Sequence, residues 1–533
     1  MATSAEAQFD DKHYGERRWG RTILSILIAL LVALWVAGAI LAKVYPSMTG
    51  TNKSSPPIPV APGDVELVFD STGHDGEGGK VNDQQIVPAM LSLIEKAEQA
   101  VILDMFLVNQ FTGKAALPSE TADTTGQLVD ALVQKLTDNP DLWVLFITDP
   151  VNSVYQAECP AALKPVVEAG GHIVLTDLRA LPESNPLYAH PHRLLRPLLG
   201  SIPYLNTPRV EHPFDKDEDK VAWMQILDML NFKANHRKVL LTCDGDGAWH
   251  GLIGSANPHT ASSFHDNAAV VLHAGPLGVM RDSELRIAGD SLRKRPELLF
   301  SKQNPDQVVA RIHGMLEKPV PPAAAEPSPG AMTVRYCTEE AIGVTVDELL
   351  RKARQGDTVE ILMFYLADPG VQRGLREAAE RGAVIRLLLD PNKDAFGREK
   401  KGIPNRPLAT ALHKWAANRE ADVEIRWADT RGEQMHAKAL HVHEKTTDTH
   451  TLLIGSANFT SRNLRGKNLE SAVVIDNANP LAESWQTFFD KQWNNPDEVT
   501  YSVPFERYAT EGFGGMLKRI RTAFTNTTGF STY

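Results

Sequence analysis

The chain repeats its own order of segments, and this duplication constrains the fold more than any other feature. In the first half, the apolar run VILDMFLV (101–108) is followed by WVLFITDP, in which Asp149 precedes a proline. In the second half, VEILMFYL (359–366) is followed by VIRLLLDP, in which Asp390 precedes a proline. Helix-like stretches lie between these strand-like runs, an alternation typical of α/β domains. We therefore expect two duplicated α/β lobes with mostly parallel, buried sheets.

Composition divides the rest of the chain into segments. The predicted order is a cytoplasmic N-terminal tail (1–21), a transmembrane helix (22–42), a spacer (43–63), a first lobe (64–317) with an insertion (180–235), a Pro/Ala-rich linker (318–331), a second lobe (332–500) and a C-terminal tail with an amphipathic helix (501–533). The stretch 185–205 of the insertion is basic and leucine-rich, which is compatible with a cover over a cleft, with lipid contact and with an ordinary surface excursion. The C-terminal helix is compatible with a place on the membrane surface or against the core.

The apolar run 22–42 predicts one membrane-spanning helix. Its 21 residues carry no charge, and at about 1.5 Å per residue they cross a hydrocarbon core of about 30 Å. The run begins too far into the chain for an ordinary cleaved signal peptide. The basic residues that precede it are Lys12, Arg17, Arg18 and Arg21, whereas only Lys43 and Lys53 follow closely. This bias predicts a single-pass membrane protein with external (periplasmic or extracytoplasmic) lobes.

The overall charge is acidic, with 55 Lys and Arg against 66 Asp and Glu, a net charge of −11. Broad, non-specific binding of nucleic acid needs a positive surface, so nucleic acid is an unfavoured partner, although a local basic cleft stays open. The three cysteines, Cys159, Cys243 and Cys337, are widely spaced and form no CxxC pair. They therefore indicate neither a redox centre nor a metal site.

Each half carries the same set of polar residues in the same order. The first set is His236, Lys238, Ser255 and Asn257, and the second set is His436, Lys438, Ser456 and Asn458. In a strand, residues i and i+2 share a face, so each HxK motif places an imidazole beside an ammonium group. A neutral His can attack phosphorus, a cationic His can protonate the leaving oxygen, and Lys and Asn donors can stabilise the phosphate oxygens. This chemistry suits a phosphodiester.

Two HxK motifs, each followed by GSAN 16 or 17 residues after its Lys, resemble the phospholipase D superfamily. The resemblance covers both lobes and implies one active site at their interface. It also implies that His236 is the nucleophile and that His436 is the general acid and base. The form of the chemistry that it favours is cardiolipin synthase-like.

The sequence departs from the family signature at one position in each motif. The signature Asp is replaced by Cys243 in the first copy and by His443 in the second. By strand parity these positions lie on the face opposite the HxK side chains, which indicates a structural rather than a catalytic loss. Asn267 and Glu470 occupy matching places after the motifs and are candidate partners for the imidazoles of their own lobes. A Glu470 that supports a cationic His436 and an Asn267 that leaves His236 neutral would favour His236 as the nucleophile.

These observations predict a membrane-anchored phosphodiesterase or phosphatidyltransferase that acts on glycerophospholipids through a phosphohistidine. A nuclease of the same superfamily and a catalytically silent binding module are the alternatives. The histidines at 436, 441, 443 and 450 also invite comparison with a zinc site, but no HExxH motif or Cys pair completes one, and we expect packed or solvent-facing histidines. No metal and no cofactor are expected. The predicted partners are a phospholipid membrane and a phospholipid substrate, with both half-sites in one chain.

Overall fold

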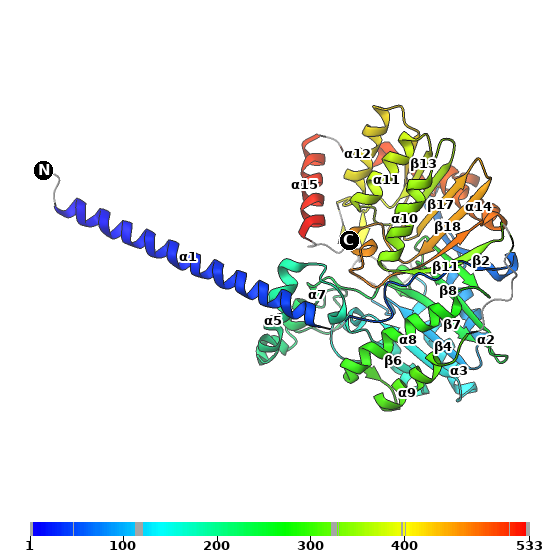
Figure 1. The fold of residues 1–533 in the computed structure, drawn as a ribbon, viewed down its shortest axis with the longest axis horizontal. Coiled ribbons are helices and arrows are strands. Elements are labelled where there is room, and N and C mark those ends of the chain that lie inside the picture. Colours follow the sequence, from blue (N-terminus) through cyan, green and yellow to red (C-terminus); the bar gives the residue numbers. More distant parts are fainter. Residues whose placement is uncertain are drawn as a thin grey trace.

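The computed structural model describes residues 4–45, 47–111, 121–320, 328, 330–395, 398–399, 401–510 and 512–528. Most of the predicted linker and the end of the C-terminal tail lie outside these residues. Two nine-stranded sheets, each with its own helices, form two lobes (Figure 1). The predicted pair of α/β lobes is therefore confirmed.

The first sheet belongs to the first lobe. Its spatial order is β10 (Leu299–Phe300), β6 (His172–Leu175), β5 (Trp143–Thr148), β4 (Ala100–Met105), β7 (Lys238–Cys243), β8 (Trp249–Gly254), β9 (Asn267–Leu272), β2 (Val65–His74) and β3 (Lys80–Gln84). Strands β4, β5 and β6 are parallel to one another, and every other neighbouring pair in the sheet is antiparallel.

The second sheet repeats this arrangement. Its order is β1 (Ile58–Pro59), β11 (Thr333–Thr338), β19 (Ser471–Asp476), β18 (Thr449–Gly455), β17 (Lys438–Glu444), β12 (Thr358–Met363), β13 (Val384–Leu389), β16 (Val423–Ala428) and β20 (Ser502–Pro504). The parallel strands are again three neighbours, β12, β13 and β16. A separate pair is formed by β14 (Asp394–Ala395) and β15 (Arg398–Glu399).

The prediction of mostly parallel sheets is wrong in this detail. Only the strands joined through helices are parallel, because a parallel connection needs a long crossover. From each HxK motif onward, short turns join β7 to β8 and β17 to β18, and such turns produce antiparallel hairpins. The apolar runs of these hairpin strands are fully buried, so the sequence pattern did not separate the two kinds of strand.

The helices cover the outer faces of the two sheets. The first sheet is covered by α2 (Ile86–Lys96), α3 (Thr124–Asp138) and α4 (Lys164–Ala169), and the second by α10 (Glu340–Lys352), α11 (Pro369–Glu380) and α12 (Asn405–Ala417). The inner faces share one apolar core, to which Leu241 of β7, Leu452 of β18 and Trp485 contribute. Around this core lie α8 (Leu277–Lys294), α9 (Pro305–Leu316) and α14 (Ala482–Asn494), whereas Leu464 of α13 (Ser461–Leu464) packs in the core of the second lobe with α10. The two lobes thus pack sheet against sheet.

A long N-terminal helix, α1 (Ser4–Val44), projects from the lobes (Figure 1). Its stretch Thr22–Val44 is long and apolar enough to cross a membrane, in line with the predicted apolar helix. The insertion folds as α5 (Pro186–Gly200), α6 (Pro203–Asn206) and α7 (Trp223–Met229), with α5 packed on α1. The predicted C-terminal helix is present as α15 (Gly512–Thr528), on which Leu517, Ile520 and Phe524 are exposed.

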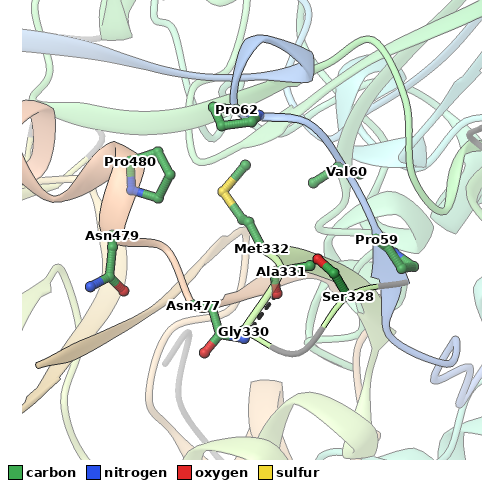
Figure 2. Close-up of a pocket in the computed structure, with 10 residues that line it drawn as sticks. All are labelled: Pro59, Val60, Pro62, Ser328, Gly330, Ala331, Met332, Asn477, Asn479 and Pro480. Atoms are coloured by element: carbon green, nitrogen blue, oxygen red, sulfur yellow. Dashed lines mark hydrogen bonds between the residues drawn. The ribbon is translucent and has the colours of Figure 1, made fainter. Parts of the chain in front are cut away.

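The segment predicted as a spacer is packed against the lobes. Its strand β1 pairs with β11 of the second sheet, and the amide of Ser55 donates to the carbonyl of Tyr336 at 2.9 Å. Figure 2 shows a pocket beside this segment, where the Asn477 side chain donates to the carbonyl of Ala331 at 2.9 Å. None of the residues that line this pocket is a predicted site residue, so the pocket is separate from the candidate active site.

Candidate active site

The two HxK motifs meet where the lobes face each other. Each histidine lies two residues before its strand, β7 or β17, and each is held by the backbone of the opposite lobe. The amide of His236 donates to the carbonyl of Leu469 at 2.9 Å, and the amide of His436 donates to the carbonyl of Asp266 at 2.8 Å. The two half-sites therefore form one interface related by an approximate two-fold symmetry.

The side chains that hold the imidazoles also come from the opposite lobe. Nδ1 of His236 lies 3.0 Å from Oε2 of Glu470, and Nδ1 of His436 lies 3.1 Å from Oδ1 of Asn267. The predicted pairing within each lobe is wrong. Asn267 and Glu470 do match each other in position, since Asn267 begins β9 and Glu470 directly precedes β19. Both side chains contact the histidine of the other lobe, which chain order alone does not reveal.

The two serines of the GSAN turns orient these partners. Ser255 donates to Oδ1 of Asn267 at 2.9 Å, and Ser456 donates to Oε2 of Glu470. Each serine oxygen also accepts a backbone amide, from Ala268 at 3.1 Å or from Ser471 at 3.0 Å. The serines therefore act on the residues that hold the histidines, and we assign them a positioning role.

The surroundings of the two partners differ in charge. The second carboxylate oxygen of Glu470 accepts from the side chain of Asn463, whereas the amide of Asn267 donates to Asp70 at 3.2 Å. Burial alone would raise the pKa of Glu470, but His236 and its neighbours hold that pKa below its usual range. Glu470 is therefore an anion beside one imidazole, while the other imidazole has only a neutral amide.

The asparagines of the GSAN turns present donors toward the interface. Oδ1 of Asn257 accepts the amide of Leu107 at 3.4 Å, and Oδ1 of Asn458 accepts the amide of Tyr365 at 3.3 Å. With each oxygen engaged, each NH₂ group is left as the donor that a ligand can use. Both asparagines are buried, which would make such hydrogen bonds stronger than in water.

The two lysines are buried beside the histidines. Nζ of Lys238 donates to the carbonyl of His236 at 2.8 Å, and Lys438 donates to the carbonyl of His436. Burial lowers the pKa of Lys238 to about 7, although Glu470 and other carboxylates oppose the shift. Burial, and next the positive charge of Lys238, lower the pKa of Lys438 well below its ordinary value. Two ammonium groups that repel each other across the interface form a site in which an anion is stabilised.

Burial also lowers the pKa of both histidines. The pKa of His236 falls to about 4, with Glu470 opposing the shift. The pKa of His436 falls well below its usual value because burial is reinforced by Lys438 and other cationic groups, His236 among them. Because Oε2 and Oδ1 are acceptors, each Nδ1 carries the proton in the neutral ring, which leaves each Nε2 lone pair available.

Two aspartates fix the backbone just before each histidine. Oδ2 of Asp149 accepts the amide of Asn235 at 2.7 Å, and Oδ2 of Asp390 accepts the amide of Met435 at 3.0 Å. These are the Asp-Pro residues that end β5 and β13. The sequence offered the signal, since Asp-Pro occurs at the same place in both halves, but the pattern alone predicts only a strand end.

Aromatic rings at the ends of β4 and β12 also belong to the site. The ring of Phe106 lies edge-on to His236 with centroids 4.8 Å apart, and the ring of Phe364 lies 5.3 Å from that of His436. The Nζ atoms of the two lysines lie 5.1 and 5.4 Å from the centroids of the same rings. The repeated Met-Phe pair in the two apolar runs was the available signal for these residues.

The residue between His and Lys differs between the motifs. Arg237 is fully buried and forms ion pairs with Glu284 at 3.0 Å and with Glu339 of the second lobe at 2.6 Å. Its counterpart in the second motif is Ala437, which packs in the core between the lobes. The Arg237 ion pairs thus join the lobes beside the first motif, and Ala437 has no charged group with which to form a counterpart. Sequence reasoning missed these ion pairs, although the HRK and HAK triplets differ visibly.

The two residues that replace the signature Asp, Cys243 and His443, lie away from the histidines of the HxK motifs. Cys243 packs with Val239 and Leu241 in the core between the lobes, on the opposite strand face from Lys238, as predicted from parity. Burial raises the pKa of the Cys243 thiol to about 11, which argues against a reactive thiolate. His443 lies 2.9 Å from Asp448 at the far end of the β17–β18 hairpin.

The remaining histidines of the predicted cluster stack on that hairpin, apart from His436. His441 bonds Glu360 through Nδ1 at 2.9 Å and His450 through Nε2 at 2.9 Å. Ligand atoms of His443, Asp448 and His450 lie within 4.8 Å of one another. The rings of His443 and His450 are nearly parallel, at 6°, so their nitrogens do not converge on a common point. The arrangement matches packed, partly solvent-facing histidines.

Comparison with known proteins adds a family match. Residues 346–493 match the family model described as cardiolipin synthase, PLD-like domain, which confirms the predicted resemblance for most of the second lobe. Among curated proteins no relative is found.

Three solved structures are similar to this chain. Phosphatidylserine synthase from Haemophilus influenzae Rd KW20 is 9% identical, with a TM-score of 0.49, over 89% of this chain and 96% of that one. Nuc, a phospholipase D family member from Salmonella typhimurium, is 23% identical over 31% of this chain and 95% of its own, with a TM-score of 0.24. Polyphosphate kinase from Porphyromonas gingivalis is 12% identical over 77% of this chain and 47% of its own, with a TM-score of 0.35.

Proposed function

From a phospholipase D-like domain in the second lobe and a matching half-site in the first, we propose that this chain is a membrane-anchored phosphodiesterase or phosphatidyltransferase. Its substrates are glycerophospholipids and its chemistry is cardiolipin synthase-like. The observation that carries the proposal is the pair of buried HxK motifs whose histidines are each held by the opposite lobe. Each lobe supplies one lysine and one imidazole, so only the two lobes together supply the full set that would surround one small anion.

The proposed reaction has two displacements at phosphorus. Nε2 of His236 attacks the phosphorus atom, the bond to the leaving oxygen breaks, and Nε2–H of His436 supplies the proton to that oxygen. An acceptor hydroxyl then gives its proton to Nε2 of His436 and attacks phosphorus, and the P–N bond to His236 breaks. Lys238, Lys438 and the two GSAN asparagines donate to the non-bridging oxygens throughout.

His236 remains the proposed nucleophile, although the reason changes with the pairing. A phosphorylated imidazole that keeps its Nδ1 proton is cationic, and the Glu470 carboxylate 3.0 Å away would stabilise it. His436, beside the neutral Asn267, would give up its proton more readily and suits the general acid. The negative charge of a bound phosphodiester would raise the pKa of His436 toward the range in which it can carry that proton.

The apolar stretch Thr22–Val44 supports a lipid substrate. A helix fixed in the bilayer would hold the site close to headgroups and raise their effective concentration. We propose that α1 spans the membrane once, with the N-terminus in the cytoplasm and the lobes outside. A spacer that packs on the lobes, as residues 47–63 do, would keep the site at a fixed height above the membrane.

The test is turnover by the full-length chain in vesicles that contain labelled phosphatidylglycerol and phosphatidylethanolamine, with single-stranded DNA assayed in parallel. Release or transfer of the phosphatidyl group by the wild type, and its loss in a His236→Asn, His436→Asn double variant, is the expected result. Cleavage of DNA without lipid turnover would replace the proposal with a nuclease. Turnover of neither substrate would favour the silent binding module.

A further inference from the structure

The insertion helix α5 packs against the apolar stretch of α1 (Figure 1). Nε1 of Trp35 donates to the carbonyl of Pro186 at 3.1 Å, and the Trp35 ring lies 4.8 Å from that of His190. A Cβ atom on Gly38 would lie only 2.0 Å from the carbonyl oxygen of His190, so the two backbones touch at this glycine. The contact is therefore specific, since a larger residue at position 38 would separate the helices.

The depth of this contact follows from the length of the helix. Trp35 and Gly38 lie nine and six residues before Val44, which corresponds to about 14 and 9 Å along the helix axis. Both residues are in the half of the apolar stretch next to the lobes. If this stretch crosses the bilayer, as the proposed function requires, the part of α5 that touches it lies within the adjoining leaflet.

The outer surface of the insertion fits that environment. Leu187 and Leu198 of α5 are each 64% exposed, and Tyr204 of α6 is 58% exposed. The arginines of α5 are paired, Arg193 with Glu183 at 2.6 Å and Arg196 with Asp228 at 2.7 Å. Exposed leucines beside neutralised arginines and a tyrosine are the features of a helix that lies in a membrane interface.

We propose that α5, with α6, is embedded in the leaflet next to the lobes and forms a lipid-contacting platform for the active site. This inference rests on the proposed membrane anchor. Hydrogen bonds connect α5 and the segment before it to α7 and to the segment that leads to His236, because Tyr188 donates to the carbonyl of Leu227 at 2.7 Å and Ser184 to the carbonyl of Phe232 at 3.0 Å. Phe232 lies four residues before His236, so the platform sets the position of the site relative to the headgroups.

The platform can be tested by spin labels on the full-length chain in vesicles of phosphatidylcholine and phosphatidylglycerol. Single cysteines at Ile28, Leu187, Leu198 and Val344 are introduced in a Cys159→Ser background and labelled with a nitroxide. Val344 is a matched control, since it is 49% exposed on α10 of the second lobe. Power saturation with oxygen and with a water-soluble nickel chelate then reports whether each label is in lipid or in water.

The expected oxygen-to-nickel accessibility ratio at positions 187 and 198 exceeds that at 344 by at least about threefold, because an interfacial helix buries its apolar face about 5–10 Å deep. A lipid signal at 28 with a water signal at 187 and 198 overturns the platform and keeps the anchor. A water signal at 28 overturns the anchor and the platform together.

A functional test separates folding from lipid contact. A Leu187→Asp, Leu198→Asp double variant should lose about tenfold of its turnover on vesicle phospholipid, because two charges oppose burial of the helix in the interface. Its turnover of soluble bis(p-nitrophenyl) phosphate should stay unchanged and shows that the site is folded. Val344→Asp should change neither rate. Unchanged turnover of vesicle phospholipid by the double variant would overturn the platform.

Discussion

The two half-sites share a backbone frame but differ in the charge that each histidine meets. In both, the histidine amide bonds a carbonyl of the opposite lobe, an Asp-Pro aspartate holds the preceding residue, and a lysine bonds the histidine carbonyl. The first imidazole meets the carboxylate of Glu470, and the second meets the amide of Asn267. The shared backbone contacts therefore fix where the two rings lie, while the charge of the partner residue determines which chemical role each ring can take.

The largest expected difference between the half-sites concerns the covalent intermediate. His236→Asn should abolish turnover, by about 10⁴-fold or more, and should form no phosphoenzyme, because the attacking nitrogen is lost. His436→Asn should accumulate an acid-labile adduct on a substrate with a good leaving group, because breakdown needs its base. Radiolabel that stays on the protein in base and is lost in acid measures the adduct. An adduct that persists in the His236 variant and vanishes in the His436 variant would exchange the two roles.

Substitutions of the two lysines should differ less in their effect on kcat/KM than substitutions of the two histidines differ in forming the adduct. Lys238→Met should reduce kcat/KM by about 10²–10³-fold, as expected for the loss of one charged donor to the phosphate oxygens. Lys438→Met should cost more, because Lys238→Met removes a charge that lowers the pKa of Lys438 and so leaves a more fully protonated lysine, whereas the pKa of Lys238 is lowered by burial. Steady-state kinetics on both variants measure the ratio, and exposed Lys352→Met is the matched control. Equal losses would show that the two ammonium groups are not coupled.

Changing the charge of the residue that partners each imidazole should shift one limb of the pH profile, and a different limb for each half-site. Glu470→Gln removes the carboxylate that raises the pKa of His236, so the acidic limb should move to lower pH and the rate should fall about 10–100-fold. Asn267→Asp adds a carboxylate beside His436, so the alkaline limb should move to higher pH. The pH dependence of kcat/KM measures both limbs. If Glu470→Gln moved only the alkaline limb, the carboxylate would act through the other imidazole.

The smallest expected effect on activity is that of a substitution at His74, which lies in the interface between the lobes but away from the catalytic rings. His74 of the first lobe lies 3.6 Å from Asp429 and 3.1 Å from Glu433 of the second. Burial alone would lower the pKa of His74, but these carboxylates raise it to about 9. The pKa of His74 in the folded protein thus exceeds the unfolded value of about 6.5. The stability that these ion pairs contribute is therefore fully present below pH of about 6.5 and is lost as pH rises through about 9.

His74→Gln should therefore change activity at pH 7 by less than about twofold while lowering the free energy of unfolding by about 1–3 kcal/mol. The difference from the wild type should disappear above pH of about 9.5. Denaturant unfolding at several pH values measures it. A destabilisation that is independent of pH would assign His74 a packing role rather than an ionic one.

Much of the architecture was predictable because local patterns repeat. The matched apolar runs predicted two α/β lobes, and the uncharged stretch predicted the long apolar helix. The antiparallel halves of the sheets were missed because buried hairpin strands show the same continuous apolar runs as parallel ones. Phe106, Phe364 and the two Asp-Pro aspartates were visible as repeated residues, but their roles depend on contacts with neighbouring strands.

The sequence by itself determined which residue types stand together along each strand and turn, since periodicity and spacing act within a few residues. It therefore supplied both HxK motifs, both GSAN turns and the correspondence of Asn267 with Glu470. Only the tertiary structure decided that each histidine is held from the other lobe, across separations of 234 and 169 residues. The physical reason is that this pairing is set by two sheets packed face to face through one shared core, and no local pattern encodes which strand end then faces which ring.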